Sequence, residues 1–189
     1  KIAFSSDRFN PGEPWDNEIF VINFTDSPGQ EVHVSDGSTY LDNSVTISGD
    51  GTKIAWHTGP NTPYKHGEYI TVADLSDINH ITYTIIDPPQ WGMYPTLSDD
   101  GEKVCFTHVD TGGNWIGILL ANSDGTGLMQ IFDQPGQGVI SGDGNKVAIQ
   151  WSDGDREISV YDIASGNLIR VTNNNVDDWL GSINYHGDI

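Results

Sequence analysis

Short hydrophobic segments separated by polar turns recur along this chain, and no window of helical length carries an apolar stripe with helical periodicity. Apolar and polar residues alternate over 44–47, a turn follows, and a second hydrophobic segment begins at Ile54. The alternation returns over 69–72 and 81–84, with β-branched and aromatic residues. Alternation bounded by Gly, Asp and Asn is typical of half-buried antiparallel strands, so the pattern predicts an all-β protein.

One strand occurs four times at nearly even spacing, each time beginning at a lysine: Lys1-Ile2-Ala3-Phe4, Lys53-Ile54-Ala55-Trp56, Lys103-Val104-Cys105-Phe106 and Lys146-Val147-Ala148-Ile149. A turn of one design precedes three of these copies: Ser48-Gly49-Asp50-Gly51, Ser98-Asp99-Asp100-Gly101 and Ser141-Gly142-Asp143-Gly144. Each repeat is then one supersecondary unit that needs neighbours to bury its apolar face. Four-stranded units of roughly 40–50 residues, arranged radially, are β-propeller blades.

We therefore predict an all-β fold, a β-propeller of four antiparallel four-stranded repeats, in a single domain over residues 1–189. The repeats run over about 1–51, 52–101, 102–144 and 145–189. The hydrophobic residue after each lysine holds the same place in its repeat. We expect all four of these residues to be buried in equivalent positions: Ile2, Ile54, Val104 and Val147.

Three stretches, 48–56, 98–106 and 141–149, resemble the S-P-D-G-x-x-I-A-F signature of TolB-like propeller repeats. The usual proline of the signature is replaced by Gly49, Asp99 and Gly142, so the match is to the repeat class and not to one close relative. The resemblance implies a propeller that serves as a binding platform, as a gating or partner domain of a peptidase, or as the scaffold of a pectate-type lyase. It therefore implies no single function.

The two ends of the chain resemble parts of one repeat. Residues 2–5 match a second strand without a first, and residues 182–185 match a first strand followed by a degenerate turn. Because bare strand edges invite aggregation, we predict a split blade shared by the N- and C-terminal strands, with 182–185 paired to 2–5 of the same chain or of a neighbour. Three arrangements stay open: a ring of four blades, a larger ring completed by two copies, or a piece of a longer chain.

Acidic residues outnumber basic ones by 27 to 8, which gives a net charge of −19. Such a surface repels nucleic acid and anionic membranes, and suits a saline or extracellular medium. No apolar stretch is long enough to span a membrane. The single Cys105 stands where three other repeats carry alanine, and it rules out an internal disulfide framework. We expect an extracellular or periplasmic protein.

Antiparallel strands place their connections on two sides of a propeller. The Asp-Gly turns are short and serve turn geometry, whereas the opposite side carries longer loops with aromatic residues. These loops supply a candidate ligand-binding face for a protein or carbohydrate partner. Trp91 and Tyr94 are expected to be the most exposed members of the face, which comprises Trp15, Tyr64, His66, Trp91, Tyr94 and Trp179.

Candidate chemistry is sparse. No cofactor is expected except calcium, for which the densest carboxylate clusters are Asp153 with Asp155 and Asp177 with Asp178, although no stretch fits the twelve-residue calcium loop. No spacing ties His57, His66 and His108 into a metal site, and no nucleophile elbow or phosphate loop is found.

The sequence favours a secreted, non-catalytic propeller module that binds a protein or glycan or assembles with its own copies. The alternative is a propeller-fold carbohydrate lyase or the propeller part of a peptidase.

Overall fold

The computed structural model describes residues 1–8, 17–24, 30–35, 40–60 and 69–188. This part of the chain contains strands and turns without a helix, as the sequence predicts, and hence no helix that could cross a membrane. The strands are β1 (Ile2–Ser6), β2 (Glu18–Asn23), β3 (Gln30–His33), β4 (Tyr40–Ile47), β5 (Lys53–Pro60), β6 (Tyr69–Asp74), β7 (Thr82–Ile86), β8 (Trp91–Leu97), β9 (Lys103–Val109), β10 (Trp115–Asn122), β11 (Met129–Phe132), β12 (Gly136–Ile140), β13 (Lys146–Ser152), β14 (Arg156–Asp162) and β15 (Leu168–Arg170).

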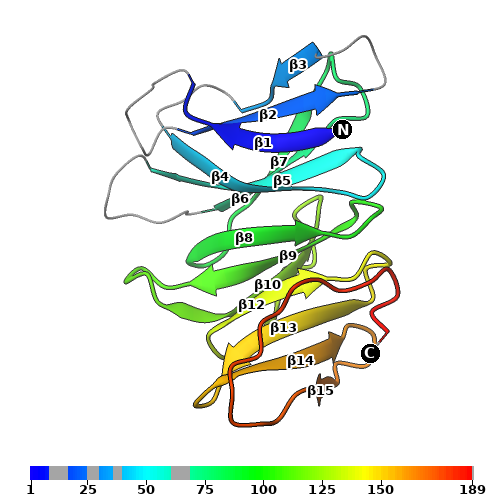
Figure 1. Ribbon diagram of the computed structural model, residues 1–189. Helices are drawn as coiled ribbons and strands as arrows, with labels where there is room; N and C mark the ends of the chain where they lie inside the picture. The colour runs from blue at the N-terminus through cyan, green and yellow to red at the C-terminus, as the bar shows by residue number, and fades with distance from the viewer. Residues whose placement is uncertain (9–16, 25–29, 36–39, 61–68, 189) are drawn as a thin grey trace.

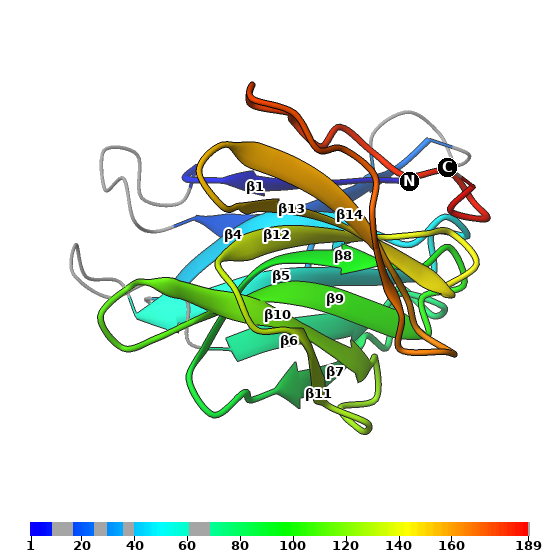
Figure 2. The same cartoon turned by 90° about the horizontal axis from the view of Figure 1, so that it is seen from below.

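The strands form four antiparallel sheets in chain order. Sheet A comprises β1–β3, sheet B comprises β4–β7, sheet C comprises β8–β11 and sheet D comprises β12–β15. Sheet A therefore has three strands where the other sheets have four. Each sheet packs on the next, and Figure 1 shows sheets A and D at opposite ends of the stack. Figure 2 shows the outer strands β7 and β11 on the same side of this stack. The propeller of four blades is confirmed.

The core lies between successive sheets because the strands present alternate residues to opposite faces. We call the face turned toward the next sheet the forward face and the opposite one the backward face. Ala55, Ile70 and Val72 on the forward face of sheet B pack against Val104 and Phe106 on the backward face of sheet C. The same arrangement joins sheet A to sheet B and sheet C to sheet D. Neighbouring blades thus bury each other's apolar faces.

The predicted burial of the residue after each lysine holds for three copies and is wrong for one. Ile54, Val104 and Val147 are fully buried, whereas Ile2 is 50% exposed. The reason is the position of sheet A at the end of the stack. Ile2 alternates with Ala3, which packs toward sheet B, so Ile2 belongs to the backward face, against which no sheet of the described residues packs.

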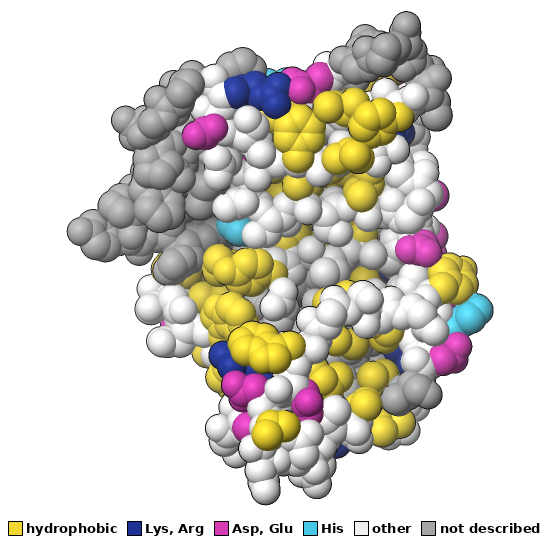
Figure 3. Space-filling model, in the orientation of Figure 1, with side chains coloured by type: hydrophobic (Ala, Val, Ile, Leu, Met, Phe, Trp, Pro, Cys, Tyr) yellow, Lys and Arg dark blue, Asp and Glu magenta, His cyan; other side chains and the backbone are white. Residues whose placement is uncertain are grey.

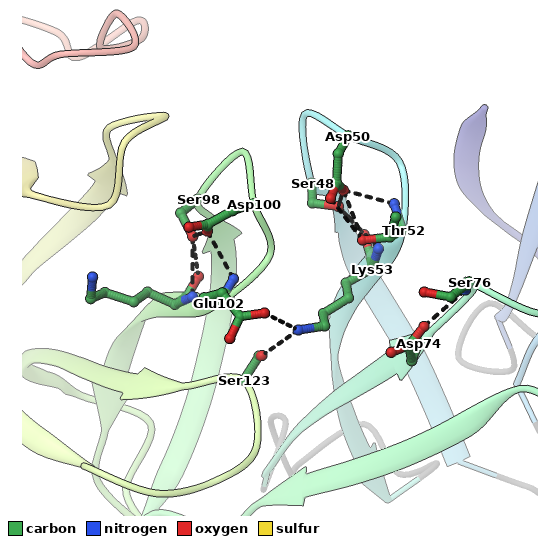
Figure 4. Close-up of polar contacts among 11 residues, drawn as sticks. Ser48, Asp50, Thr52, Lys53, Asp74, Ser76, Ser98, Asp100, Glu102 and Ser123 are labelled. Atoms are coloured by element: carbon green, nitrogen blue, oxygen red, sulfur yellow. Dashed lines mark hydrogen bonds and ion pairs between the residues drawn. The ribbon is translucent and has the colours of Figure 1, made fainter.

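The repeated turns lock neighbouring blades together (Figure 4). In each turn the aspartate accepts hydrogen bonds from the preceding serine hydroxyl and from the backbone N–H two residues on; Asp50, for example, accepts from Ser48 at 2.7 Å and Thr52 at 2.9 Å. A lysine then reaches across to the next blade: Lys53 Nζ donates to Glu102 at 2.8 Å and to Ser123 at 3.1 Å. The aspartates thus serve turn geometry, as predicted, and the lysine adds contacts between blades that the sequence analysis did not predict.

The structure explains why the signature proline is absent. The side chain of Asp99 lies between the turns of sheets B and D: a Cβ added at Gly49 would come within 2.5 Å of it, and one added at Gly142 within 2.6 Å. Backbone hydrogen bonds also join the turns, from Asp50 N to Asp99 O at 2.9 Å and from Asp99 N to Gly142 O at 2.8 Å. With Asp99 in this position, a side chain at either Gly49 or Gly142 would force the neighbouring side chains to move.

The predicted pairing of residues 182–185 with 2–5 inside one chain is wrong. Residues 182–188 form no strand, and β2 is the neighbour of β1 in sheet A. The C-terminal segment lies instead against sheet D, where Asp143 N donates to Tyr185 O at 2.8 Å. This contact places the segment at the far end of the stack from β1 (Figure 1).

Candidate functional site

Two strained residues mark the inner strands of sheets B and C. Ser44 and Tyr94 have φ values of 54° and 53°, and they are the non-glycine residues with positive φ in the described part of the chain. Each precedes the serine of its turn by the same distance, and each lies where the pairing register shifts, in β4 between Asn43 and Thr46 and in β8 between Met93 and Thr96. A left-handed conformation costs an ordinary residue on the order of 1–2 kcal/mol.

The bulge in β8 places Tyr94 between two other rings. Tyr94 meets the imidazole of His57 edge-on at 6.2 Å between centroids, and the indole of Trp115 at 5.7 Å. The three rings come from β8, β5 and the start of β10, so the group bridges sheets B and C. Bulges commonly re-aim a side chain next to a functional site. We name this group the aromatic site; Tyr94 is half-buried and Trp115 is 36% exposed.

A second histidine lies in the same interface between sheets. His57 alternates with Trp56 and shares the forward face of sheet B with Ala55, whereas His108 shares the backward face of sheet C with Phe106. In the sequence His108 stands one residue later in its repeat than His57 does, and this offset turns both side chains toward one interface. Strand alternation alone produces this result.

His108 is 8% exposed, and neither ring nitrogen has a hydrogen-bond partner. The residues opposite it on both neighbouring strands are glycines, Gly92 of β8 and Gly117 of β10. Burial lowers the pKa of His108, so the ring is neutral at physiological pH. A neutral imidazole offers one donor and one acceptor, and leaving both unused in a buried position costs free energy. The imidazole of His108 is therefore a buried polar group without a hydrogen-bond partner in the interface between sheets B and C.

The structure places the sequence-predicted ligand-binding residues in three groups. Trp15, Tyr64 and His66 lie outside the described residues. Trp91 and Tyr94 are half-buried members of β8 and not exposed loop residues, because the strand begins at Trp91. Trp179 follows the last strand of sheet D, is 68% exposed and stacks on the guanidinium of Arg156 of β14 at 4.0 Å.

Two of the four candidate calcium ligands, Asp153 and Asp177, are paired with arginines. Arg170 Nη1 lies 2.9 Å from Asp153, and Arg170 Nη2 lies 2.9 Å from the fully buried Glu157. Arg156 pairs with Asp177 at 2.9 Å, and Asp178 accepts from Asn174 at 2.7 Å. Hydrogen bonds from Thr172, and then from Asn174 and Arg170, lower the pKa of Glu157.

Within the described residues, Asp153, Asp155 and Glu157 are the one group of three side chains that could hold a metal ion. Asp177 and Asp178 lie outside it. One carboxylate oxygen of Asp155 has no hydrogen-bond partner. A cation at this group would have to displace Arg170 from Asp153 and Glu157. Calcium binding here stays a prediction.

Sequence reasoning named Tyr94 but missed Trp115 and the joint position of His57 and His108. Trp115 stood in the sequence where other repeats begin their third strand with glutamate and a hydrophobic residue. That departure from the repeat was the available signal. The strained φ of Tyr94 had none, since tyrosine is not a residue that predicts a left-handed backbone.

No protein-family model matches the chain, and a search of curated proteins finds no relative. Solved structures do match. TolB from Acinetobacter baumannii superposes with a TM-score of 0.64 at 20% identity, over 90% of this chain and 41% of TolB. An oligogalacturonate lyase in complex with manganese gives 0.64 at 16% identity, over 90% of this chain and 51% of that one.

A chain of a nidogen/laminin complex gives a TM-score of 0.57 at 13% identity, over 85% of this chain and 60% of that one. At these identities the likeness shows the fold, a TolB-like β-propeller. The chain spans less than two thirds of the length of each of these neighbours.

Proposed function

We propose that this protein is a non-catalytic propeller module, working outside the cytoplasm, that binds a neutral carbohydrate at the aromatic site. The observation that carries the proposal is the strained Tyr94. Ser44 has the same backbone conformation at the equivalent bulge of sheet B, and in sheet C the bulge holds a tyrosine ring between His57 and Trp115 in a partly open position. Strain of this kind persists where the surroundings enforce it, and it concentrates at ligand sites.

The composition of the site fits a sugar. The ring of Trp115, which is 36% exposed, offers an apolar face, and the half-buried Tyr94 beside it carries a hydroxyl group that can exchange hydrogen bonds with a sugar. Carbohydrates present both kinds of surface. The net charge of −19 opposes polyanionic ligands, so a neutral sugar fits better than an acidic one.

The enzyme alternative has less support. A lyase or peptidase needs converging catalytic side chains, and one neighbour of this fold is an oligogalacturonate lyase with manganese. In the described part of this chain the one group of potential metal ligands is Asp153, Asp155 and Glu157. Arg170 forms ion pairs with Asp153 and Glu157, and the group lies in sheet D, away from the aromatic site in sheets B and C.

Binding of neutral oligosaccharides, measured by isothermal titration calorimetry, tests the proposal. Trp115→Ala should raise the Kd about tenfold, on the scale of one aromatic anchor. Tyr94→Gly should weaken binding similarly, because it removes the ring while glycine still adopts the positive φ, and circular dichroism checks that this variant folds. Trp179→Ala is the matched control, because that exposed indole lies on sheet D.

Two outcomes would overturn the assignment. If Trp179→Ala abolishes sugar binding while Trp115→Ala does not, the ligand binds elsewhere. If no neutral oligosaccharide binds but a protein partner does, and Trp115→Ala weakens that complex, the site recognises protein. The neighbour in the nidogen/laminin complex makes a protein the next ligand class to test.

A further inference from the structure

His108 lies between the two strands that carry the rings of the aromatic site. Its strand β9 runs between β8 and β10, where its register partners are Gly92 and Gly117. Tyr94 follows Gly92 by two residues in β8, and Trp115 precedes Gly117 by two residues in β10. The pairing register of both flanking strands shifts beside this row. A movement of the imidazole therefore acts directly on the strands that hold the two rings.

The row around this imidazole is closely packed. A Cβ added at Gly92 would lie 3.0 Å from side-chain atoms of Ile70 and of Phe106. A Cβ added at Gly117 would lie 2.5 Å from the side chain of Gln130. Because a close-packed interior transmits a local change to its neighbours, the strands must move when the imidazole leaves its place.

Other repeats have a glutamate where sheet C has Gly117. Glu157 is the register partner of Trp151, which holds in β13 the place of His108 in β9, five residues after the lysine. Glu18 holds the same place in β2. Both glutamates are buried, at 0% and 3% exposure. Sheet C thus combines a histidine with the loss of the carboxylate that could balance its positive charge.

Among the described residues, no carboxylate faces the imidazole of His108 from the elements packed against it. The titratable groups on that side are His57 of β5 and Tyr94 of β8. Asp42 of β4 is bonded on the opposite face of its sheet, toward sheet A, and Asp110 accepts backbone N–H groups of its own turn. In Figure 3 acidic side chains lie toward the margins of the visible face, and hydrophobic side chains occupy parts of its middle, over sheets B and C.

We propose that His108 makes the aromatic site sensitive to pH. When the pH falls, its imidazole takes up a proton, the packing of sheet B on sheet C loosens, and the strands that hold Tyr94 and Trp115 shift and release the ligand. A protonated imidazole in this interface has two N–H donors without an acceptor and a charge without a counter-charge, so the packed arrangement is disfavoured. The release of ligand rests on the proposed carbohydrate binding, whereas the loosening of the interface does not.

The direction of the shift sets the pH range. Burial lowers the pKa of His108 from its ordinary value of 6.5. The interface therefore has its full stability above about pH 6.5 and loses it as the pH falls from there toward the folded pKa.

Quenching of tryptophan fluorescence by acrylamide tests the loosening without any sugar. The difference between the wild type and Trp115→Phe isolates the signal of Trp115, whose side chain is 36% exposed. From about pH 7.5 to about pH 5, this signal should become about twofold more accessible to acrylamide in the wild type. His108→Leu cannot take up a proton and should show no such rise, measured against its own Trp115→Phe double variant.

Two further variants make the comparison specific. His80→Gln is the matched control and should keep the full rise, because the side chain of His80 is 82% exposed and pairs with Asp77. Circular dichroism at both pH values checks that each variant is folded, and an unfolded His108→Leu is replaced by His108→Gln. The absence of a rise in the wild type overturns the proposal, as does an equal rise in His108→Leu. A rise that His57→Gln removes and His108→Leu keeps also overturns it, since His57 is then the titrating group.

Calorimetry tests the release with the neutral oligosaccharide that binds most tightly at about pH 7.5. Its Kd should rise at least about tenfold at about pH 5 for the wild type, and less than about threefold for His108→Leu. An equal loss of affinity in both proteins contradicts control of the site by His108. If no neutral oligosaccharide binds at either pH, the proposed function fails, and the quenching experiment still decides whether His108 controls the interface.

Discussion

The aspartate of each repeated turn should make the protein sensitive to acid, and Asp143→Asn isolates one of these contributions. Asp143 Oδ1 accepts from Ser141 Oγ at 2.7 Å and from Asn145 N at 3.0 Å, and its carboxylate faces His186 Nδ1 at 3.5 Å. Burial alone would raise the pKa of Asp143, but the hydrogen bonds outweigh it and lower the pKa to about 2. Asparagine can accept the same two bonds without the charge.

The magnitude follows from the difference between the folded and unfolded pKa. A shift from 3.8 to about 2 corresponds to about 2.4 kcal/mol, at 1.36 kcal/mol per unit. The side chain is 17% exposed, so solvent screening reduces this to about 1–2 kcal/mol. Because the folded pKa is the lower one, the stabilisation is complete above about pH 4 and is lost as the pH falls toward 2.

Urea unfolding followed by circular dichroism measures the effect. Asp143→Asn should lower the free energy of unfolding by about 1–2 kcal/mol at neutral pH, and by only a few tenths of a kcal/mol near pH 2. The exposed Asp133 provides the control, and Asp133→Asn should change neither value appreciably. An equal loss at both pH values would show that hydrogen-bond geometry, and not charge, explains the role of Asp143, and would refute this reasoning.

Two further predictions concern packing. Gly142→Ala should lower the free energy of unfolding by about 1–3 kcal/mol, because the added Cβ would lie 2.6 Å from side-chain atoms of Asp99 and Tyr185. Gly181→Ala is the control, because a Cβ there meets nothing within 4 Å. Equal melting temperatures of the two variants would contradict the close packing of the turns. Cys105 is fully buried, and burial raises the pKa of its thiol. A thiol reagent should therefore react with Cys105 only as fast as the protein unfolds. Rapid labelling of the native protein would contradict the buried position.

The blade architecture was largely predictable because it is repetitive. The sequence Lys-hydrophobic-small-hydrophobic with its preceding Asp-Gly turn encodes a local hairpin, and hairpins of this kind bury their faces only by stacking. The burial of Ile54, Val104 and Val147 followed directly. Ile2 has the same local sequence and differs in exposure, because burial depends on the neighbouring blade and not on the strand itself.

The candidate site was predictable only in part. The sequence singled out Tyr94 as an aromatic residue on a suitable side, but it placed Tyr94 in an exposed loop, whereas the residue lies at a bulge within β8. The acidic clusters were visible as well. Their arginine partners, such as Arg170 with Asp153 and Glu157, come from other strands and could not be assigned from spacing.

The sequence by itself therefore determined most of the strands, the repeated turns and the stacking of four blades, since these depend on local alternation and on glycine and aspartate in turns. The tertiary structure decided which faces meet. It brought His57 and His108 into one interface, set Asp99 between Gly49 and Gly142, and left the forward face of sheet D open to the C-terminal segment. Such contacts join residues far apart in the chain, and their geometry depends on the twist and packing of whole sheets, which no local pattern records.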